Sequence, residues 1–317
     1  MSGCCSGLTR HTGHRAATLA PHASAAFRAS LMQDLCEIAG GLFEMGTNSP
    51  RYAADLSGPA RQVRVSPFRL AARQVTNRHF ARFIAESGYV TVAEREGWSF
   101  VFHLYATEQG APFEGPAEAP WWRAVPGAFW AAPQGPGSDW RDRPDHPVVH
   151  VAWEDAQAFC QFTGLRLPFE AEWECAARGG LARKAYPWGE DALREGRHGH
   201  NVWQGHFPTE DRAEDGFAGL APVGQYPPNG FGLYDMTGNA WDWCADWFGP
   251  LPHAQMPPLL DPKGPASGEE RVIRGGSHLC HASYCERYFT HSRTRTTPDS
   301  STGHISFRVA ADPETTS

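Results

Sequence analysis

Glycine and proline interrupt this chain so often that long helices or strands cannot dominate its fold. The sequence holds 33 Gly and 26 Pro among 317 residues, together with 12 Trp. Proline removes a backbone donor and glycine weakens regular elements, so both favour turns. We therefore predict a loop-rich α+β domain and exclude a helical bundle or a repeat array.

No Gly/Ser or Pro linker divides residues 36–313, which predicts a single domain followed by a short tail at 314–317. The first 33 residues contain three Arg, three His and no acid. This composition overlaps with that of organellar transit peptides, while a start codon assigned too early gives the same pattern. We expect residues 1–35 to be disordered or a leader.

Charge and hydropathy exclude two classes of partner. No stretch approaches about 18 consecutive apolar residues, so no membrane span is expected. A net charge of −7 without a Lys/Arg cluster argues against nucleic-acid binding. The eight cysteines are scattered and do not suggest a disulfide scaffold, which predicts a reducing, cytoplasmic location.

Local patterns predict a few regular elements. We expect strands at 38–46, 62–70 and 146–153, and helices at 75–88, 155–162 and 170–178. Thr76 or Asn77 can cap the first helix and Gly88 can end it. Phe169 stands where a Ser or Thr cap is expected, at a cost of about 1 kcal/mol. Residues 104–147 lack periodicity and are predicted to be irregular.

Two cysteines near the C-terminus, Cys280 and Cys285, lie five residues apart behind Gly275 and Gly276. A redox or zinc motif would normally read Cys-x-x-Cys, and structural zinc needs further ligands. On a helix the two side chains would point about 140° apart, so they can share one partner only if the chain bends. The glycines permit such a bend. Two thiolates with no further ligand favour Cu(I), although a buried pair or a disulfide fits the spacing too.

Several motifs resemble the formylglycine-generating enzyme and sulfatase-modifying factor superfamily, whose fold is a variant of the C-type lectin architecture. Those typical of the fold are 166–174, 177–180, 186–189 and 229–243. Those typical of the formylglycine-generating enzymes are 98–102, 119–122, 201–205, 261–265, 275–288 and 297–301. The resemblance extends from about residue 36 to residue 313.

The resemblance implies an oxidase that converts a cysteine in the Cys-x-Pro-x-Arg motif of an unfolded or nascent sulfatase to Cα-formylglycine, with O2 and Cu(I). Cys280 and Cys285 would be catalytic copper ligands, and Ser277 would lie beside the site of O2 and the substrate thiol. Four further residues would line the substrate cleft: Trp241, His281, Tyr284 and Arg287. We expect a monomer.

Two calcium sites also follow from the resemblance, because Ca2+ accepts a mixture of side-chain and carbonyl oxygens. The first would use the side chains of Asn201 and Asp215 and the carbonyls of Val202 and Phe217. The second would use the side chains of Asp235 and Asp242 and the carbonyls of Gly238 and Ala240. Asp235 and Asp242 stand where the family often has Asn and Glu.

The chain departs from the family pattern at Phe289, where Arg is usual, at Ser306, where Gly is usual, and at His278, where Phe or Tyr is usual. Two disulfides of secreted relatives are missing. Cys160 keeps one half of the first, but Val309 stands at the position of its partner, and Ala177 and Thr290 replace both cysteines of the second. The lost disulfides fit a reducing compartment. Phe289 affects the expected substrate more than metal binding.

Two other functions use the same fold. Iron-dependent sulfoxide synthases carry an additional helical domain with a His-x3-His-x-Glu motif, and this sequence has neither. Non-catalytic members bind peptide or sugar and typically lack the cysteine pair. The pair His198 and His200 has no clear further ligand and is interpreted as part of a loop.

Overall fold

The computed structural model describes residues 22–107, 115–251 and 256–314. The helices are α1 (Ala25–Met32), α2 (Asn77–Ser87), α3 (Val92–Glu96), α4 (Trp153–Thr163) and α5 (Glu170–Ala177), with 3-10 turns η1 (Ala53–Asp55) and η2 (Trp140–Asp142). The first strands are β1 (Leu35–Ile38), β2 (Gly41–Met45), β3 (Arg61–Val65), β4 (Phe68–Ala71), β5 (Trp98–Phe102) and β6 (Trp122–Pro126). Four two-residue strands follow: β7 (Leu193–Arg194), β8 (Arg197–His198), β9 (Gly205–His206) and β10 (Glu210–Asp211). The last are β11 (Trp241–Trp247), β12 (Leu259–Leu260), β13 (Arg271–Arg274), β14 (Arg293–Thr296), β15 (Ile305–Ser306) and β16 (Ala310–Ala311).

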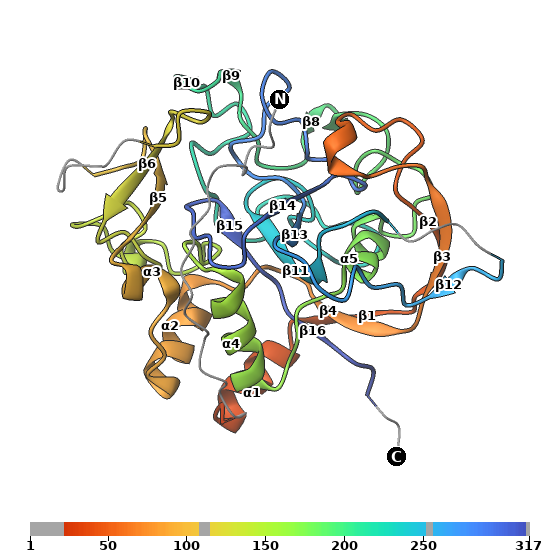
Figure 1. Cartoon of the computed structure of the whole chain (residues 1–317), viewed down its shortest axis with the longest axis horizontal. Helices are drawn as coiled ribbons and strands as arrows, with labels where there is room; N and C mark the ends of the chain where they lie inside the picture. The colour runs from red at the N-terminus through yellow and green to blue at the C-terminus, as the bar shows by residue number, and fades with distance from the viewer. Residues whose placement is uncertain (1–21, 108–114, 252–255, 315–317) are drawn as a thin grey trace.

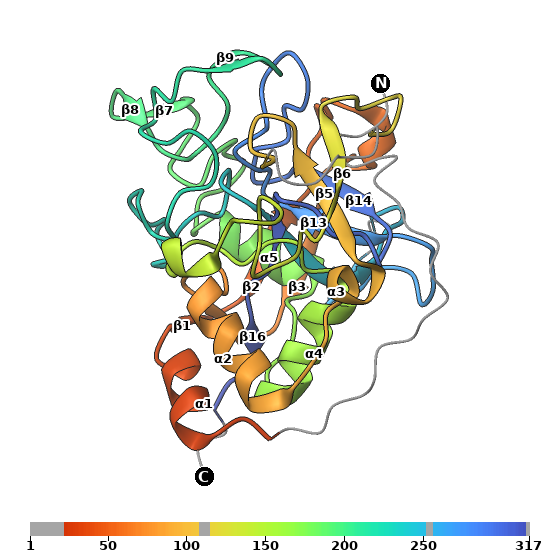
Figure 2. The ribbon, with the colours of Figure 1, turned by 90° about the vertical axis from the view of Figure 1, so that its left-hand side faces the viewer.

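A four-stranded sheet in the order β14-β13-β11-β15 forms the centre of the molecule. β13 pairs antiparallel with β11 and β14, while β15 runs parallel to β11. Two three-stranded sheets, β1-β4-β16 and β12-β3-β2, lie beside it. Helices α1, α2 and α4 gather at one end, and the loops that carry β7 to β10 lie at the opposite end (Figures 1 and 2). Long loops therefore build one end of the domain.

The core has two main parts. The first packs α2 and α4 against the central sheet and contains Phe80, Phe159, Trp241 and both Cys280 and Cys285. The second surrounds α5, which contacts β2, β3, β11 and β13. The two cysteines are therefore anchored in the core of the domain.

The predicted helices are confirmed with shifted ends. Thr76 caps α2 by accepting the His79 N–H at 3.3 Å, and Gly88 ends this helix in the left-handed conformation with φ +67°. Phe169 occupies the N-cap position of α5 and gives no side-chain cap. Glu172 compensates in part, since its carboxylate accepts the Phe169 N–H at 2.8 Å.

Three sequence predictions need correction. The strand predicted at 62–70 is divided into β3 and β4, because Pro67 has no N–H to continue the ladder. Residues 147–152 are buried but form no strand: Pro147 makes an isolated bridge to Thr76, His150 has φ +60°, and Trp153 already begins α4. The irregular segment 104–147 contains β6, which pairs with β5.

The boundary predicted at residue 36 between a disordered or leader segment and the folded domain needs correction. Residues 25–32 form α1, and Phe27 and Leu31 of this helix belong to the main core. Folded structure therefore precedes residue 36. The part of the predicted leader at 1–21 lies outside the described residues.

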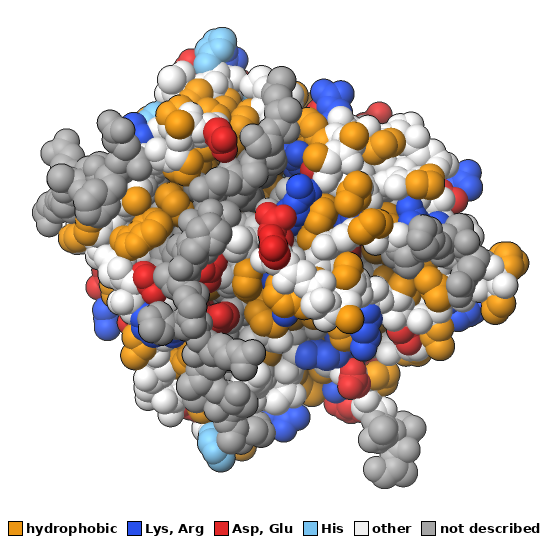
Figure 3. All heavy atoms as spheres, viewed as in Figure 1, with side chains coloured by type: hydrophobic (Ala, Val, Ile, Leu, Met, Phe, Trp, Pro, Cys, Tyr) orange, Lys and Arg blue, Asp and Glu red, His pale blue; other side chains and the backbone are white. Residues whose placement is uncertain are grey.

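Basic and acidic side chains are interspersed on the face shown in Figure 3, where no large basic area is visible among the coloured residues. Oppositely charged side chains of the described residues also pair, such as Arg78 with Asp145 at 3.0 Å and Arg295 with Glu270 at 2.8 Å. Within the described ranges, no helix has the length and apolar character needed to cross a bilayer.

Candidate active site

The cysteine loop, defined as residues 275–292, connects the neighbouring strands β13 and β14. It begins with Gly275 and Gly276, whose φ angles are +95° and +79°. A Cβ on Gly276 would lie 3.0 Å from the Arg287 carbonyl oxygen, so a side chain would be both strained and crowded. The predicted non-helical bend at the two glycines is therefore present.

This bend brings the two thiols together. Cys280 Sγ and Cys285 Sγ lie 3.2 Å apart, and both side chains are buried and free of disulfides. Each sulfur accepts an N–H: Cys280 Sγ from the Ser277 backbone at 3.4 Å, and Cys285 Sγ from Arg287 Nη1 at 3.7 Å. Residues five positions apart thus point at one place, with hydrogen-bond donors directed at both sulfurs.

The distance between the sulfurs fits a shared soft metal ion. A metal–sulfur bond of about 2.3 Å allows two sulfurs up to about 4.6 Å apart to contact one ion, and these sulfurs are within that limit. Among the described residues, no group of three or more His, Cys, Asp or Glu is arranged to hold a metal. The donor set therefore fits a low-coordinate ion such as Cu(I), which two thiolates can bind.

A small aromatic pocket lies over the sulfurs. Tyr284 stacks on Phe207 with ring centroids 4.5 Å apart, and Trp121 meets Tyr284 edge-on at 4.6 Å. The cavity is about 10 Å³, close to the room that one water molecule needs. Its lining consists of Trp121, Trp122, Phe207, Ser277, Leu279, Cys280, Tyr284, Cys285 and His304. The pocket is therefore largely protected from bulk water.

The residues predicted for the site are distributed unevenly. Ser277 and Tyr284 line the pocket, and Ser277 Oγ accepts the Leu279 N–H at 3.3 Å. His281 is half-buried outside this lining, and its Nδ1 lies 2.8 Å from Ser283 Oγ. Trp241 is not part of this lining, and its side chain is completely buried in the core.

Arg287, predicted to line the substrate cleft, is instead buried beside Cys285. Its guanidinium pairs with Asp55 at 2.6 Å, and only 2% of the residue is exposed. Arg287 is absent from the lining of the aromatic pocket. Its contact with a substrate stays a prediction.

His304 lines the pocket and was missed from the sequence. Its Nδ1 lies 2.7 Å from Thr302 Oγ1, and its ring packs on Trp122 at 4.6 Å. Burial lowers the pKa of His304 well below the usual value, and His278 and His150 lower it further, so the imidazole is neutral. A single histidine near the C-terminus carries no signal in the sequence, whereas the adjacent Trp121 and Trp122 could have indicated a functional pocket.

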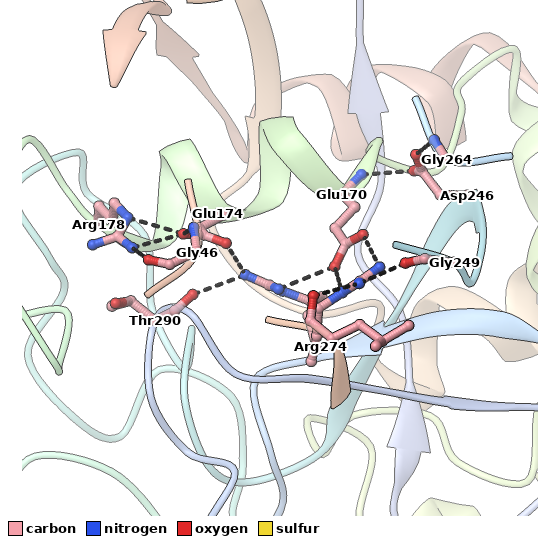
Figure 4. Close-up of polar contacts among 11 residues, drawn as sticks. Gly46, Glu170, Glu174, Arg178, Asp246, Gly249, Gly264, Arg274 and Thr290 are labelled. Carbon is pink, nitrogen blue, oxygen red and sulfur yellow. Dashed lines mark hydrogen bonds and ion pairs between the residues drawn. The ribbon is translucent and has the colours of Figure 1, made fainter. Parts of the chain in front are cut away.

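A buried ion network closes the base of the cysteine loop (Figure 4). Arg274 and Arg293 face each other as register partners on β13 and β14. Glu170 of α5 binds both, through Arg274 Nη1 at 3.1 Å and Arg293 Nε at 2.6 Å. Arg274 Nη2 also donates to Glu174 at 2.7 Å and to the Thr290 carbonyl at 2.9 Å. The helix thus offsets the repulsion between two arginines and fixes both ends of the loop.

Part of the first predicted calcium set converges. The Val202 carbonyl and Asp215 Oδ2 both accept hydrogen bonds from Gln204 Nε2, the second at 2.9 Å. Asp215 Oδ1 accepts the Phe217 N–H at 3.1 Å, and the amide nitrogen of Asn201 donates to the Gly219 carbonyl at 2.8 Å. Two of the four predicted oxygens therefore point at one donor position, which suits a cation.

The second set converges at Gln74. Its Nε2 donates to the Ala240 carbonyl at 2.7 Å and to Asp242 Oδ1 at 2.9 Å, while its buried Oε1 has no hydrogen-bond partner among the described residues. Asp242 Oδ2 is held by Arg308 at 2.7 Å. Asp235 accepts the Gly224 N–H at 2.7 Å, and Gly238 donates its own N–H to the Gly275 carbonyl at 2.9 Å. Two of the predicted oxygens and one orphaned amide oxygen thus fit a cation here.

The departures from the family pattern are accommodated by packing. Phe289 is half-buried between Tyr186 and His291, with ring centroids 5.4 Å and 5.5 Å away. Cys160 and Val309, the remnant of one expected disulfide, both lie in the main core. Position 289 is therefore part of an aromatic cluster, where it offers no charge to a substrate.

The chain matches known proteins over most of its length. A family model described as the sulfatase-modifying factor enzyme 1-like domain matches residues 22–313. The formylglycine-generating enzyme of Thermomonospora curvata is 53% identical over 89% of this chain and 95% of its own length. A mouse protein named inactive C-alpha-formylglycine-generating enzyme 2 is 43% identical over 87% of this chain and 85% of its length.

The solved structure of PvdO from Pseudomonas aeruginosa superposes with a TM-score of 0.61 and covers 88% of this chain and 94% of PvdO. At 23% identity this likeness concerns the fold alone. Together, the loop-rich α+β fold and the paired thiols define a formylglycine-generating-enzyme type of domain. The chain belongs to the sulfatase-modifying factor family, as the sequence predicted.

Proposed function

We propose that this protein converts a cysteine in the Cys-x-Pro-x-Arg motif of a sulfatase to Cα-formylglycine, using O2 and Cu(I). The observation that carries the proposal is the pair of buried cysteine sulfurs 3.2 Å apart beneath a small aromatic pocket. Family membership alone is insufficient, because a relative at 43% identity is named as inactive. The thiol pair supplies the chemical reason to choose the active alternative.

Cys280 and Cys285 would hold the ion, and Cu(I) would supply the one-electron chemistry with O2 that amino-acid side chains lack. The protein's own contribution is positioning. Ser277 lines the same pocket as both sulfurs, which supports a role for its hydroxyl beside the substrate thiol. Trp121, Phe207 and Tyr284 would exclude water from the reacting cysteine.

His304 fits the proposal as a neutral hydrogen-bonding group in the pocket. Because burial lowers its pKa well below the usual value, it adds no positive charge near the sulfurs. The ion network beneath the loop keeps the loop ends in place, so that the sulfurs do not need to be reorganised when substrate arrives.

The test is conversion of a peptide that contains Cys-x-Pro-x-Arg by the purified full chain with Cu(I), a reductant and O2. Mass spectrometry should show replacement of the cysteine CH2SH by an aldehyde, and an aldehyde-reactive hydrazide should label the product. A peptide with Arg replaced by Ala is the matched control and tests whether Phe289 has altered the motif. Absence of aldehyde with verified copper loading would exclude the proposal.

We also propose that Ca2+ binds near Asp215 and near Asp242, where it would stabilise loops that lack regular structure. Support comes from the carbonyl and carboxylate oxygens that converge on Gln204 Nε2 and on Gln74 Nε2. Calorimetric titration should show Ca2+ binding, and Asp215→Asn should weaken one site only. A midpoint of thermal unfolding that is the same in Ca2+ and in a calcium chelator would contradict the proposal.

A further inference from the structure

Arg287 brings a charged hydrogen-bond donor to one sulfur of the thiol pair. Its Nη1 lies 3.7 Å from Cys285 Sγ, within hydrogen-bonding range for sulfur. Cys280 Sγ instead accepts a neutral backbone N–H, from Ser277 at 3.4 Å. The two sulfurs are therefore held by different kinds of donor, and a charged donor bonds more strongly than a neutral one.

The guanidinium of Arg287 is itself fixed by a distant part of the chain. Asp55, in η1, accepts from Arg287 Nε at 2.6 Å and from Nη2 at 3.0 Å. The ring of Tyr52 lies 4.0 Å below the guanidinium carbon, and Tyr52 Oη accepts the Glu286 N–H at 3.1 Å. Residues 52–55 thus contact Glu286 and Arg287, the two residues that follow Cys285.

The Arg287 guanidinium makes three kinds of contact. One edge meets a carboxylate, one nitrogen meets the sulfur, and the flat face covers an aromatic ring. A lysine could supply a charge but not the planar fork that makes these contacts together. This geometry suits a side chain that fixes the position of the Cys285 sulfur.

We propose that Arg287 is a positioning residue for Cys285: anchored by Asp55 and Tyr52, it fixes the Cys285 sulfur through a charged N–H···S hydrogen bond. The inference rests on the proposed function, in which Cys280 and Cys285 bind one copper ion. It assigns Arg287 a role on the protein's own ligand and makes residues 52–55 a supporting part of the site. Outer-shell partners of this kind commonly change metal affinity by about 10- to 100-fold when removed.

The experiment compares Arg287→Met, Arg287→Lys and Asp55→Asn in the full chain. The matched control is Arg295→Met. Arg295 also contacts residues 52–55, because it donates to the Ala54 carbonyl at 2.7 Å, and it pairs with Glu270 and not with either sulfur. Circular dichroism and thermal unfolding establish that each variant is folded. Copper affinity is measured by competition with a Cu(I) chelator, and the ultraviolet thiolate-to-copper absorption is recorded.

Arg287→Met should weaken Cu(I) binding about 10- to 100-fold and move the absorption to longer wavelength, because the positive charge no longer stabilises the sulfur electrons. Arg287→Lys should recover part of both effects. Asp55→Asn should weaken binding less, since Arg287 remains but loses its anchor. Arg295→Met should leave the affinity within about threefold of the wild type. If Arg287→Met fails to fold, Asp55→Asn decides the question.

Equal affinity and an unchanged spectrum in Arg287→Met, or in Asp55→Asn where the former is unfolded, would overturn the inference and leave the proposed function standing. Weakened copper binding in Arg287→Met, together with a wild-type protein that binds Cu(I) but yields no aldehyde, would support the inference and refute the proposed function. A wild-type chain that binds no Cu(I) would overturn both.

Discussion

Replacement of Glu170 by Gln should destabilise this protein more than any surface charge change. Glu170 is 3% exposed, and its carboxylate contacts Arg274 and Arg293, which are 0% and 1% exposed. Gln keeps the shape but removes the negative charge between two guanidinium groups that face each other across β13 and β14. Breaking a buried ion pair from one side costs about 3–5 kcal/mol. We expect a loss in this range, because Glu174 still pairs with Arg274 whereas Arg293 loses its carboxylate partner.

Urea unfolding followed by tryptophan fluorescence measures this loss. The matched control is Glu270→Gln, because Glu270 directly precedes β13 and pairs with Arg295 of β14, while the two side chains are 33% and 32% exposed. Exposed pairs contribute at most about 1 kcal/mol, so the control should change little. Equal effects of the two substitutions would refute the view that Glu170 fixes the base of the cysteine loop.

Two further predictions concern the backbone of the loop and pH. Gly276→Ala should lower the free energy of unfolding by about 1–3 kcal/mol and weaken Cu(I) binding, because the new Cβ would lie 3.0 Å from the Arg287 carbonyl oxygen. Gly88→Ala is the control, since Gly88 has a similar φ but open space around it, and it should destabilise less and leave copper binding unchanged. Burial lowers the pKa of His200 from 6.5 to about 3, so below pH 6.5 only the unfolded chain takes up this proton. As the pH falls from 6.5 toward about 3, His200 alone should therefore lower the free energy of unfolding by about 1.4 kcal/mol per pH unit. His200→Gln should reduce by one the protons taken up on unfolding near about pH 5, and an unchanged pH slope in denaturant titrations would contradict this.

The sequence predicted the fold class and family well, because both depend on local motifs that survive along the chain. The cap at Thr76 and the stop at Gly88 are local signals too, and the structure confirms them. The bend at Gly275 and Gly276 was predictable, since two thiols five residues apart cannot otherwise meet.

Other parts of the site depend on contacts between distant segments, which spacing cannot reveal. Arg287 was expected to face a substrate, but its partner Asp55 lies 232 positions earlier in the chain. Trp241 belongs to a family motif, but its side chain is buried in the core. His304 enters the pocket from the position just before β15, where no sequence pattern marks it.

The proposed copper centre is tested most directly by copper-edge X-ray absorption on the full chain loaded with one equivalent of Cu(I). Protein sulfur from Cys280 and Cys285 should account for two scatterers around a single ion, and a substrate peptide should raise the count to three. Either Cys280→Ala or Cys285→Ala should abolish that two-sulfur signature. A copper ion surrounded mainly by nitrogen or oxygen, or one that keeps both sulfurs in these variants, would contradict the account.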